Sequence, residues 1–403
     1  LNGTTVNWGG TGSKIFRNGV VAIGSGSMVR NASTGSWQIG DTTVAGDAEI
    51  GGSSGSLTLN NPSGISVSSV CSATLTSNAT LTAGTFTNNG VLNLGTYVLS
   101  GTAGFSAALS STLITANTGG LVSAIAVSGT QTFVAGANYV FNASTTTPFP
   151  TGTFGNPANL TFNNADVTSN RTATLTVTGA VNINGTSKFA LNSVAGNDLA
   201  LGGVMTIGAN ASFDSNGENQ INNAGGSVVV NGTFITKDAQ GFSGTNATIP
   251  TITNITLNTG STIQYALDGA QAISSRTDYK NLLFTGNGTK SSNNSITPIA
   301  GTVTVNGANT ILDVSNNTFG NSSTNLTMTA GTFRLGGSGV KPDISGTYSL
   351  SAGTTIEFTG TSATQIRLAP QYANVVISGT NIVAGTTTNG GLTFRTGGNF
   401  TVK

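Results

Sequence analysis

The carboxylate pairs of this chain are the residues whose types and spacing could do chemistry. Asp47 and Glu49 stand two positions apart, so both side chains would face the same side of a β-strand. Asp214 and Glu218 bracket the segment Asp-Ser-Asn-Gly-Glu, which is typical of a turn. The first pair suits a weak Ca²⁺ site or a solvent-facing pair, but Ca²⁺ takes about six to eight oxygen ligands. We therefore interpret Asp47 and Glu49 as solvated surface residues and the second pair as an ordinary turn.

The chain lacks histidine, and Cys71 is its single cysteine. These counts exclude Ser-His-Asp and Cys-His catalysis, and also His-containing and Cys-rich metal sites. Cys71 can form no intrachain disulfide, and Arg30 is its nearest basic residue in sequence, so we expect a thiol packed inward. Gly336–Gly339 lacks the lysine of a phosphate-binding loop and is interpreted as a plain turn. We predict no catalytic residue, no metal and no cofactor; a carbohydrate-active β-helix enzyme is the less favoured alternative.

Two further groups of residues could bind a sugar. Threonine alternates with other residues in Thr172–Thr178, and a flat row of threonine hydroxyls could contact ice or glycans. Threonine is also a good strand former with a wettable face, and we favour this simpler explanation. Trp8, Trp37, Tyr279 and Tyr372 could be platforms on which sugars stack. Because Tyr279 and Tyr372 occupy matched positions of an internal repeat, we expect these two to pack inside the fold.

Charged residues are scarce in this chain. They make up 7% of the 403 residues, against about 25% in an average globular protein, and the net charge is +1. No Asp, Glu, Lys or Arg occurs from Ile50 to Ala165, so solubility must come from Thr, Ser, Asn and Gly. This balance predicts no capture of nucleic acid or of anionic membranes. No apolar run approaches the ~18–20 residues of a membrane span.

The elements that would position any site follow the period of β-strands. Apolar and polar residues alternate in Leu57–Leu59 and Ile65–Val67, as expected for half-buried strands. Several segments also recur along the chain, and a fixed internal period indicates a repeat architecture. The matched segments are Gly260–Tyr265 with Gly353–Phe358, Tyr279–Gly286 with Tyr372–Gly379, and a weaker copy in Gly136–Phe141 with Ala158–Phe162.

Two all-β architectures fit this repeat. One is an array of antiparallel sandwiches, and the other is a parallel β-helix with about three short strands per turn of the helix, here called a rung. The irregular spacing of the weaker copy favours the β-helix, because each rung contacts only its neighbours. We predict an all-β, right-handed parallel β-helix (a β-solenoid) with rungs of about 22–23 residues. Residues 1–56 would form its first rungs and residues 57–403 one continuous β-helix, with the clearest repeats at 260–286 and 353–379.

The repeat also predicts which side chains point inward and which hold the turns. Asn159, Asn281 and Asn374 recur at equivalent positions, where stacked asparagines can form hydrogen-bond ladders. The aliphatic residues of the matched segments should form the interior column. The expected inward residues are Ile263, Ile273, Leu283, Ile356, Ile366 and Val376.

The repeated segments resemble the β-strand repeats of large surface proteins of Bacteroidetes. The residues that carry this resemblance are Gly353–Gly360, Gln365-Ile366 and Tyr372–Gly379, with the same style in Thr82–Phe86 and Thr329–Phe333. The resemblance is clearest over residues 250–403, fair over 57–190 and weak over 1–56. It implies export by the type IX secretion system and an adhesin-like role. Asp41-Thr42-Thr43 is similar to the short O-glycosylation signal used in these bacteria.

The sequence therefore predicts a non-catalytic, extracellular structural or adhesive segment of a large bacterial cell-surface repeat protein. A self-assembling fibre or surface-layer subunit is the alternative, because terminal rungs expose open strand edges. The expected partners are cell-surface or extracellular glycans or proteins, and other copies of the chain joined end to end. Neither nucleic-acid binding nor a membrane span is expected. The chain has no initiator Met and no signal-peptide pattern, so we expect it to be a piece of something longer.

Overall fold

The computed structural model of the chain is an all-β solenoid of parallel strands with about 15 turns, which confirms the predicted fold class. It divides into two compact units, unit 1 (Leu1–Asn192 and Leu199–Thr206) and unit 2 (Ser193–Asp198 and Ile207–Lys403). Side-chain burial is described from residue 35 onward. The structure describes residues 5–7, 14–16, 19–22, 27–29, 35–40, 42–51, 57–150, 154–222, 225–361, 363–368, 370–384 and 391–403.

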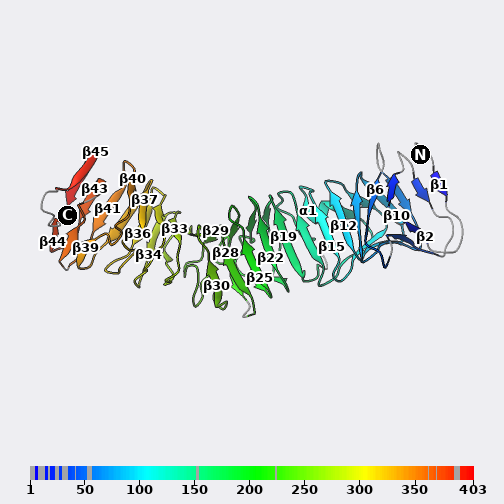
Figure 1. The fold of residues 1–403 in the computed structure, drawn as a ribbon, viewed down its shortest axis with the longest axis horizontal. Helices are drawn as coiled ribbons and strands as arrows, with labels where there is room; N and C mark the ends of the chain where they lie inside the picture. Colours follow the sequence, from blue (N-terminus) through cyan, green and yellow to red (C-terminus); the bar gives the residue numbers. More distant parts are fainter. Residues whose placement is uncertain are drawn as a thin grey trace. The chain divides into compact units, whose positions relative to one another are not determined.

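Three parallel sheets, A, B and C, build the rungs of unit 1. Successive strands enter sheets A, B and C in turn, so each rung contributes one strand to each sheet (Figure 1). Sheet A contains β1 (Thr5–Asn7), β4 (Ser27–Val29), β7 (Leu57–Asn60), β10 (Ala79–Ala83), β13 (Leu99–Gly101) and β16 (Ile125–Val127). Sheet B contains β2 (Lys14–Phe16), β5 (Trp37–Ile39), β8 (Ile65–Val67), β11 (Thr85–Asn88), β14 (Gly104–Ala107) and β17 (Gln131–Phe133). Sheet C contains β3 (Gly19–Ala22), β6 (Gly46–Gly51), β9 (Cys71–Leu75), β12 (Val91–Gly95), β15 (Thr112–Thr115), β18 (Asn138–Phe141), β19 (Asn159–Asn163), β22 (Val181–Asn184) and β25 (Val204–Ile207).

Sheets A and B end inside unit 1, and new sheets replace them. Helix α1 (Gly120–Ala124) precedes β16, and the described residues between β18 and β19 form no strand. Pro148, Pro150 and Pro157 lie in that stretch, and proline cannot donate to a strand ladder. After β19 the rungs use sheets D and E beside sheet C. Their strands in unit 1 are β20 (Asp166–Thr168) and β23 (Lys188–Ala190) in sheet D, and β21 (Leu175–Val177) and β24 (Leu199–Leu201) in sheet E.

Unit 2 repeats this construction and changes its sheets once more. Sheet C ends at β30, and a sheet that we call F begins at β32. The strands of sheets C and E in unit 2 are β28 (Ser227–Val230), β30 (Asn254–Leu257) and β27 (Ile221–Asn222). Sheet D contains β26 (Ser212–Asp214), β29 (Thr233–Thr236), β31 (Thr262–Tyr265), β33 (Asn281–Phe284), β35 (Thr302–Val305), β37 (Asn325–Met328) and β40 (Tyr348–Leu350). Sheet F contains β32 (Gln271–Ala272), β34 (Gly288–Ser291), β36 (Thr310–Asp313), β38 (Thr332–Leu335), β41 (Thr355–Phe358), β43 (Gln371–Ile377) and β45 (Thr393–Val402), and a last sheet, G, contains β39 (Gly339–Lys341), β42 (Thr364–Ile366) and β44 (Ile382–Ala384).

The core of each unit is a column of like residues that meet in register. Leu92 pairs with Leu113 on the next rung, and both side chains are fully buried. Burying a leucine side chain stabilises a fold by about 1.5–3 kcal/mol relative to leaving it exposed. Aromatic rings stack in the same way: the ring centroids of Phe162 lie 5.6 Å from those of Phe141 and 4.5 Å from those of Phe189. Because apolar residues alternate with polar ones along each strand, the apolar side chains form one continuous interior in each unit.

The internal repeat corresponds to two directly stacked strands. In unit 2, β31 pairs with β33 through Thr262 and Asn281, and β41 pairs with β43 through Thr355 and Asn374. In unit 1 the weaker copy forms the same pair, β18 with β19. The repeated sequence thus encodes one step from a strand to its neighbour. This explains why copies can occur at irregular spacing along the chain.

The predicted interior is correct at four positions and wrong at two. Ile263, Ile273, Ile356 and Ile366 are buried, as expected. Leu283 and Val376 instead point outward and are half-exposed. The residues that pair with the interior of the preceding strand, and are fully buried, are Leu282 and Val375.

The cause of this error is a run of adjacent apolar residues. Both segments contain consecutive aliphatic side chains, so alternation alone does not fix which of them faces inward. The preceding asparagine decides it. Because Asn281 and Asn374 stand on the outer side of their strands, the next residue of each strand must point inward.

The asparagines of the repeat link rungs, but in two different ways. Asn159 donates to Asn138 Oδ1 at 2.7 Å, which is the predicted side-chain ladder. Asn281 and Asn374 instead donate to backbone carbonyls of the preceding rung, those of Ser261 and Thr354, each at 3.1 Å. In all three cases the side-chain oxygen accepts an N–H from the following rung. One amide therefore joins three successive rungs.

Buried polar side chains satisfy the carbonyl groups at the corners of unit 2. Gln271 Nε2 donates to the carbonyl oxygens of Thr236 and Asp238, at 3.1 and 3.0 Å. On the next rung Lys290 pairs with Gln271 in register and is fully buried. Its ammonium donates to the carbonyl oxygens of Leu267, Gly269 and Asn287, the last two at 3.1 and 3.2 Å. The Lys290 ammonium thus lies in the interior with its hydrogen bonds going to backbone oxygens.

The two repeated tyrosines are buried at equivalent places, as predicted. Tyr279 donates to the carbonyl oxygen of Ser274 at 2.9 Å, and Tyr372 donates to that of Arg367 at 2.6 Å, five residues back in both cases. Tyr139 differs, because its buried hydroxyl has no hydrogen-bond partner within the described residues.

Tyr139 and Tyr279 allow a matched stability test. Tyr279→Phe should lower the free energy of unfolding by about 1–2 kcal/mol, since it removes a satisfied buried hydroxyl. Tyr139→Phe should leave stability unchanged or raise it, since it removes an unsatisfied one. Urea midpoints of the two variants and the parent chain measure this difference. Equal losses in both variants would contradict the hydrogen-bond assignment.

Lys290 predicts a stability that increases at alkaline pH. Burial lowers the pKa of Lys290 to about 8, and the charge of Asp268 opposes this shift. An unfolded lysine titrates near ~10.4, so between these values the unfolded chain binds more protons than the folded one. The free energy of unfolding should therefore rise between pH 8 and about 10. Urea unfolding at both pH values should show this rise in the parent chain and a smaller one in Lys290→Met, and identical pH dependence in both proteins would refute the assignment.

Candidate functional site

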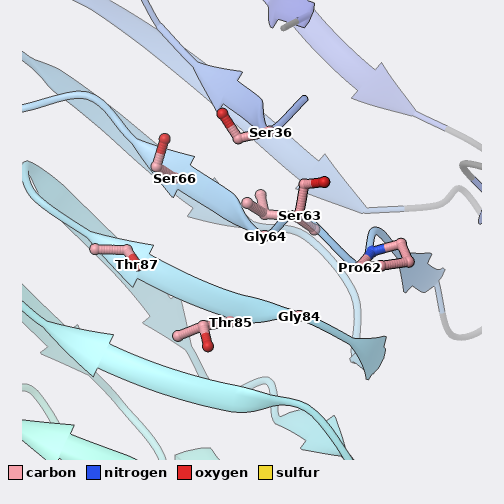
Figure 2. Close-up of a pocket in the computed structure, with 9 residues that line it drawn as sticks. Ser36, Pro62, Ser63, Gly64, Ser66, Gly84, Thr85 and Thr87 are labelled. Carbon is pink, nitrogen blue, oxygen red and sulfur yellow. The ribbon is translucent and has the colours of Figure 1, made fainter. Parts of the chain in front are cut away.

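A groove with a volume of about 370 Å³ lies on the surface of unit 1, beside strands β8 and β11. Hydroxyl side chains supply most of its lining, and we call it the hydroxyl groove (Figure 2). None of its lining residues is charged. They are Ser36, Pro62, Ser63, Gly64, Ile65, Ser66, Gly84, Thr85 and Thr87.

Two stacked turns form the floor of the hydroxyl groove. Asn61 is fully buried and holds the first turn: its Nδ2 donates to the Gly64 carbonyl at 2.9 Å, and its Oδ1 accepts the Ser63 N–H at 3.1 Å. Gly84 forms the second turn with φ +72°, a conformation that favours glycine. A Cβ atom at Gly84 would lie 2.2 Å from the Asn61 carbonyl oxygen. Glycine at position 84 therefore allows the two turns to lie close together, and backbone atoms form the floor of the groove.

A row of hydroxyls extends from the groove along the outer face of sheet B. Ser66 pairs with Thr87, Thr87 with Ser106, and Ser106 with Thr132. Their neighbours Ile65 and Phe86 point inward, so alternation places every hydroxyl of the row on the outer side. Neighbouring strands lie about 4.8 Å apart, so the row repeats at this spacing. We call Ser66, Thr87, Ser106 and Thr132 the hydroxyl row.

The chemistry of the hydroxyl groove is that of neutral hydrogen bonding. A serine or threonine hydroxyl can donate one hydrogen bond and accept two. The lining holds no carboxylate, imidazole or amine that could transfer a proton at neutral pH. The groove therefore suits a neutral ligand with many hydroxyl groups.

The two carboxylate pairs have different surroundings in the structure. Asp47 and Glu49 are both exposed on the outer side of β6, as predicted. Asp214 accepts the Asn216 N–H at 2.8 Å, which forms the expected turn, and Glu218 is exposed. Sequence analysis missed that Asp214 is buried and forms an ion pair with Lys237, with 3.1 Å between Nζ and Oδ2. Asp214 and Lys237 lie on neighbouring rungs, so their pairing could be predicted only from the register between strands β26 and β29.

The aromatic residues proposed as sugar platforms do not form them where the structure describes them. Trp37 is 2% exposed and packs inward from β5. Tyr279 and Tyr372 are buried in the interior of unit 2. Trp8 lies outside the described residues. Cys71 is buried on β9, as expected for a packed thiol.

The remaining candidate residues form ordinary surface structure. In Thr172–Thr178, Thr176 lies outward on β21 and pairs with Ala200, so the threonine row does not continue onto the next rung. Gly336, Gly337 and Ser338 form the expected turn between β38 and β39, with φ +86° at Gly337, and Gly339 begins β39. Asp41 lies outside the described residues, whereas Thr42 and Thr43 are exposed.

A ladder of charged residues, which sequence analysis missed, crosses the outer face of sheet F. Asp313, Arg334 and Glu357 follow one another in register on β36, β38 and β41. Arg334 lies 3.3 Å from Asp313 Oδ2 and 3.0 Å from Glu357 Oε2. Ser378 donates to the other Glu357 oxygen at 2.8 Å, and Lys403 lies 3.5 Å from it. Each charge of the ladder is paired within the ladder, so its role is to hold the neighbouring strands together.

Within the described residues, no three His, Cys, Asp or Glu side chains gather closely enough to hold a metal ion. No described helix has the length and apolar character needed to cross a membrane. No protein-family model, curated protein or solved structure matches the chain.

The charged ladder predicts a loss of stability at acid pH. Burial would raise the pKa of Glu357, but the hydrogen bonds from Ser378 and Arg334 and the charges of Arg334 and Lys403 outweigh it and lower that pKa. The ladder should therefore stabilise the fold above about pH 4.3 and lose this contribution as the pH falls through the folded pKa.

Arg334→Gln tests this ladder directly. The variant should lower the free energy of unfolding by about 1–3 kcal/mol at pH 7, because it leaves two carboxylates without their shared partner. Adding Glu357→Gln should recover part of the loss. Urea unfolding at pH 7 and pH 3.5 measures both effects, and a variant as stable as the parent chain at pH 7 would contradict them.

Proposed function

We propose that this chain is a structural and adhesive segment of a large bacterial cell-surface repeat protein that acts outside the cell. Its outer faces would contact cell-surface or extracellular glycans or proteins, and it would carry out no catalysis. The resemblance to Bacteroidetes surface repeats supports this proposal, and with it export by the type IX secretion system. The solenoid fold is compatible with the role, because it lengthens by adding rungs and presents extended side faces.

One observation carries the proposal: the outer face of sheet B in unit 1 presents a groove and a row of regular, uncharged hydrogen-bonding groups. The hydroxyl groove and the hydroxyl row lie on the same sheet and share Ser66 and Thr87. A net hydrogen bond contributes only about 0.5–1.5 kcal/mol, because water competes for the same groups. A single groove would therefore bind weakly. Repeated contacts along a polymeric ligand would add up, as multivalent binding does.

Self-assembly into a fibre is the second candidate function. Strand β45 is the last strand of sheet F among the described residues and pairs there with β43 alone. Phe400 and Val402 on this strand are 49% and 66% exposed. An open strand edge with apolar side chains can pair with another chain. Electron microscopy at high protein concentration tests this candidate: filaments support it, and monomers alone count against it.

The hydroxyl groove predicts a specific loss of glycan binding. Thr85→Val and Thr87→Val together should abolish binding of neutral oligosaccharides to the chain, because each change removes a hydroxyl and keeps the side-chain shape. Immobilised neutral glycans and whole bacterial or host cells serve as ligands, and bound protein is measured by surface plasmon resonance or fluorescence.

A matched control lies on the neighbouring sheet A. Thr80 and Ser100 are also outward hydroxyls on adjacent strands, with 3.4 Å between their oxygens, but they lie outside the groove. Thr80→Val with Ser100→Ala should therefore bind like the parent chain. If the parent chain bound no glycan, protein or cell and formed no assemblies, the adhesive and fibre proposals would both fail. Release of sugar products from a polysaccharide panel would contradict the non-catalytic role.

A further inference from the structure

A second groove, with a volume of about 510 Å³, lies in unit 2 where sheet D ends. Strand β40 is the last strand of that sheet and forms one wall. We call this the Arg395 groove, because its lining holds a single charged residue, Arg395 of β45. The lining residues are Gly346, Thr347, Tyr348, Ser349, Leu350, Pro370, Gln371 and Arg395.

Arg395 has hydrogen-bonding capacity to spare in this groove. Its guanidinium carries five N–H donors, and one terminal nitrogen donates to the carbonyl oxygen of Leu350 on β40. That contact anchors the side chain against the wall. Among the described residues, no carboxylate lies within ion-pair distance of Arg395, whereas Arg276 and Arg334 are both paired. The remaining N–H groups of the guanidinium are free to donate to an anion. A carboxylate can accept two of them in parallel, one at each oxygen.

The other walls offer the groups that a sugar ring uses. Tyr348 supplies a partly exposed aromatic ring, whose hydroxyl donates to the Ile344 carbonyl, and the buried Pro370 adds apolar atoms to the lining. Gln371 is exposed and adds an amide to the lining that holds Arg395. Pockets that bind small ligands combine apolar walls with a few polar groups in this way. The hydroxyl groove lacks both the aromatic ring and the cation.

We propose that the Arg395 groove binds an acidic sugar, with the ring carboxylate of a uronic acid on the Arg395 guanidinium. The sugar ring would lie against Tyr348, and its hydroxyls would meet Gln371. A carboxylate alone would use only the cation, whereas an acidic sugar uses the apolar wall and the neutral donors as well. The inference shares the ligand class of the proposed adhesive function, but it concerns a different site and a charged ligand.

The experiment compares three probes by isothermal titration at low ionic strength. Tetraglucuronic acid is the acidic probe, its carboxyl-reduced counterpart is the neutral one, and acetate is the anion alone. The acidic oligosaccharide should bind at least tenfold more tightly than either of the others, and added salt should weaken its binding. An acidic peptide added as competitor shows whether the groove prefers peptide carboxylates.

Three variants assign this binding to the groove. Arg395→Gln should weaken binding of the acidic oligosaccharide at least tenfold, and Gln371→Ala, which changes an exposed side chain outside the ion-pair network, should weaken it severalfold. Lys403→Gln is the control: it removes the same charge from the same end of the chain, but Lys403 does not line the groove. Circular dichroism checks that each variant is folded.

Several outcomes would overturn the inference. They are equal binding of the neutral counterpart, acetate binding as tight as the oligosaccharide, an unchanged Arg395→Gln, a loss in Lys403→Gln as large as in Arg395→Gln, and stronger binding of the acidic peptide. The two proposals also fail separately. Loss of neutral glycan binding in the Thr85→Val, Thr87→Val chain leaves the Arg395 groove intact, and loss of acidic-sugar binding in Arg395→Gln leaves the hydroxyl groove intact.

Discussion

The structure depends on satisfying the backbone carbonyls at the corners of each rung. A parallel strand pairs with its neighbours, but the chain leaves this ladder at every turn, and a buried carbonyl without a partner costs free energy. Amides and hydroxyls of the adjacent rung supply the missing bonds: Gln271 Nε2 donates to the Thr236 carbonyl at 3.1 Å, and Thr324 Oγ1 donates to the Ile299 carbonyl at 2.6 Å. These neutral groups can be buried at little cost once they are bonded. This requirement favours Asn, Ser and Thr at the corners of the rungs.

The same requirement shapes the surfaces that remain for function. Alternation along each strand sends one side chain to the core and the next to the outside, so regular rungs produce regular outer rows. On sheet B of unit 1 the row is made of hydroxyls, which is the hydroxyl row. On sheet F of unit 2 a row contains charges that pair with one another, as in the ladder of Asp313, Arg334 and Glu357. Arg395 stands out against this background because it lines a groove.

Much of the fold could be predicted from the sequence, because a repeat and a period of two constrain a solenoid strongly. The matched tyrosines Tyr279 and Tyr372 were correctly expected inside. The orientation of Leu283 and Val376 was not, since adjacent apolar residues leave the parity of a strand undetermined. The grooves could not be predicted at all. The hydroxyl groove depends on the close approach of two turns at Gly84. The alternation and repeats of a sequence do not give the distances between turns of neighbouring rungs.

The central claim is that this solenoid binds ligands through outer surfaces while its rungs stay unchanged. Amide hydrogen exchange of the whole chain, with and without a saturating polysaccharide ligand, tests this claim most directly. The account predicts added protection in the turns that line the hydroxyl groove, Pro62–Gly64 and Gly84–Thr85, with strand amides of both units unaffected. Protection that appears nowhere, or that spreads over all rungs without reaching these turns, would contradict it.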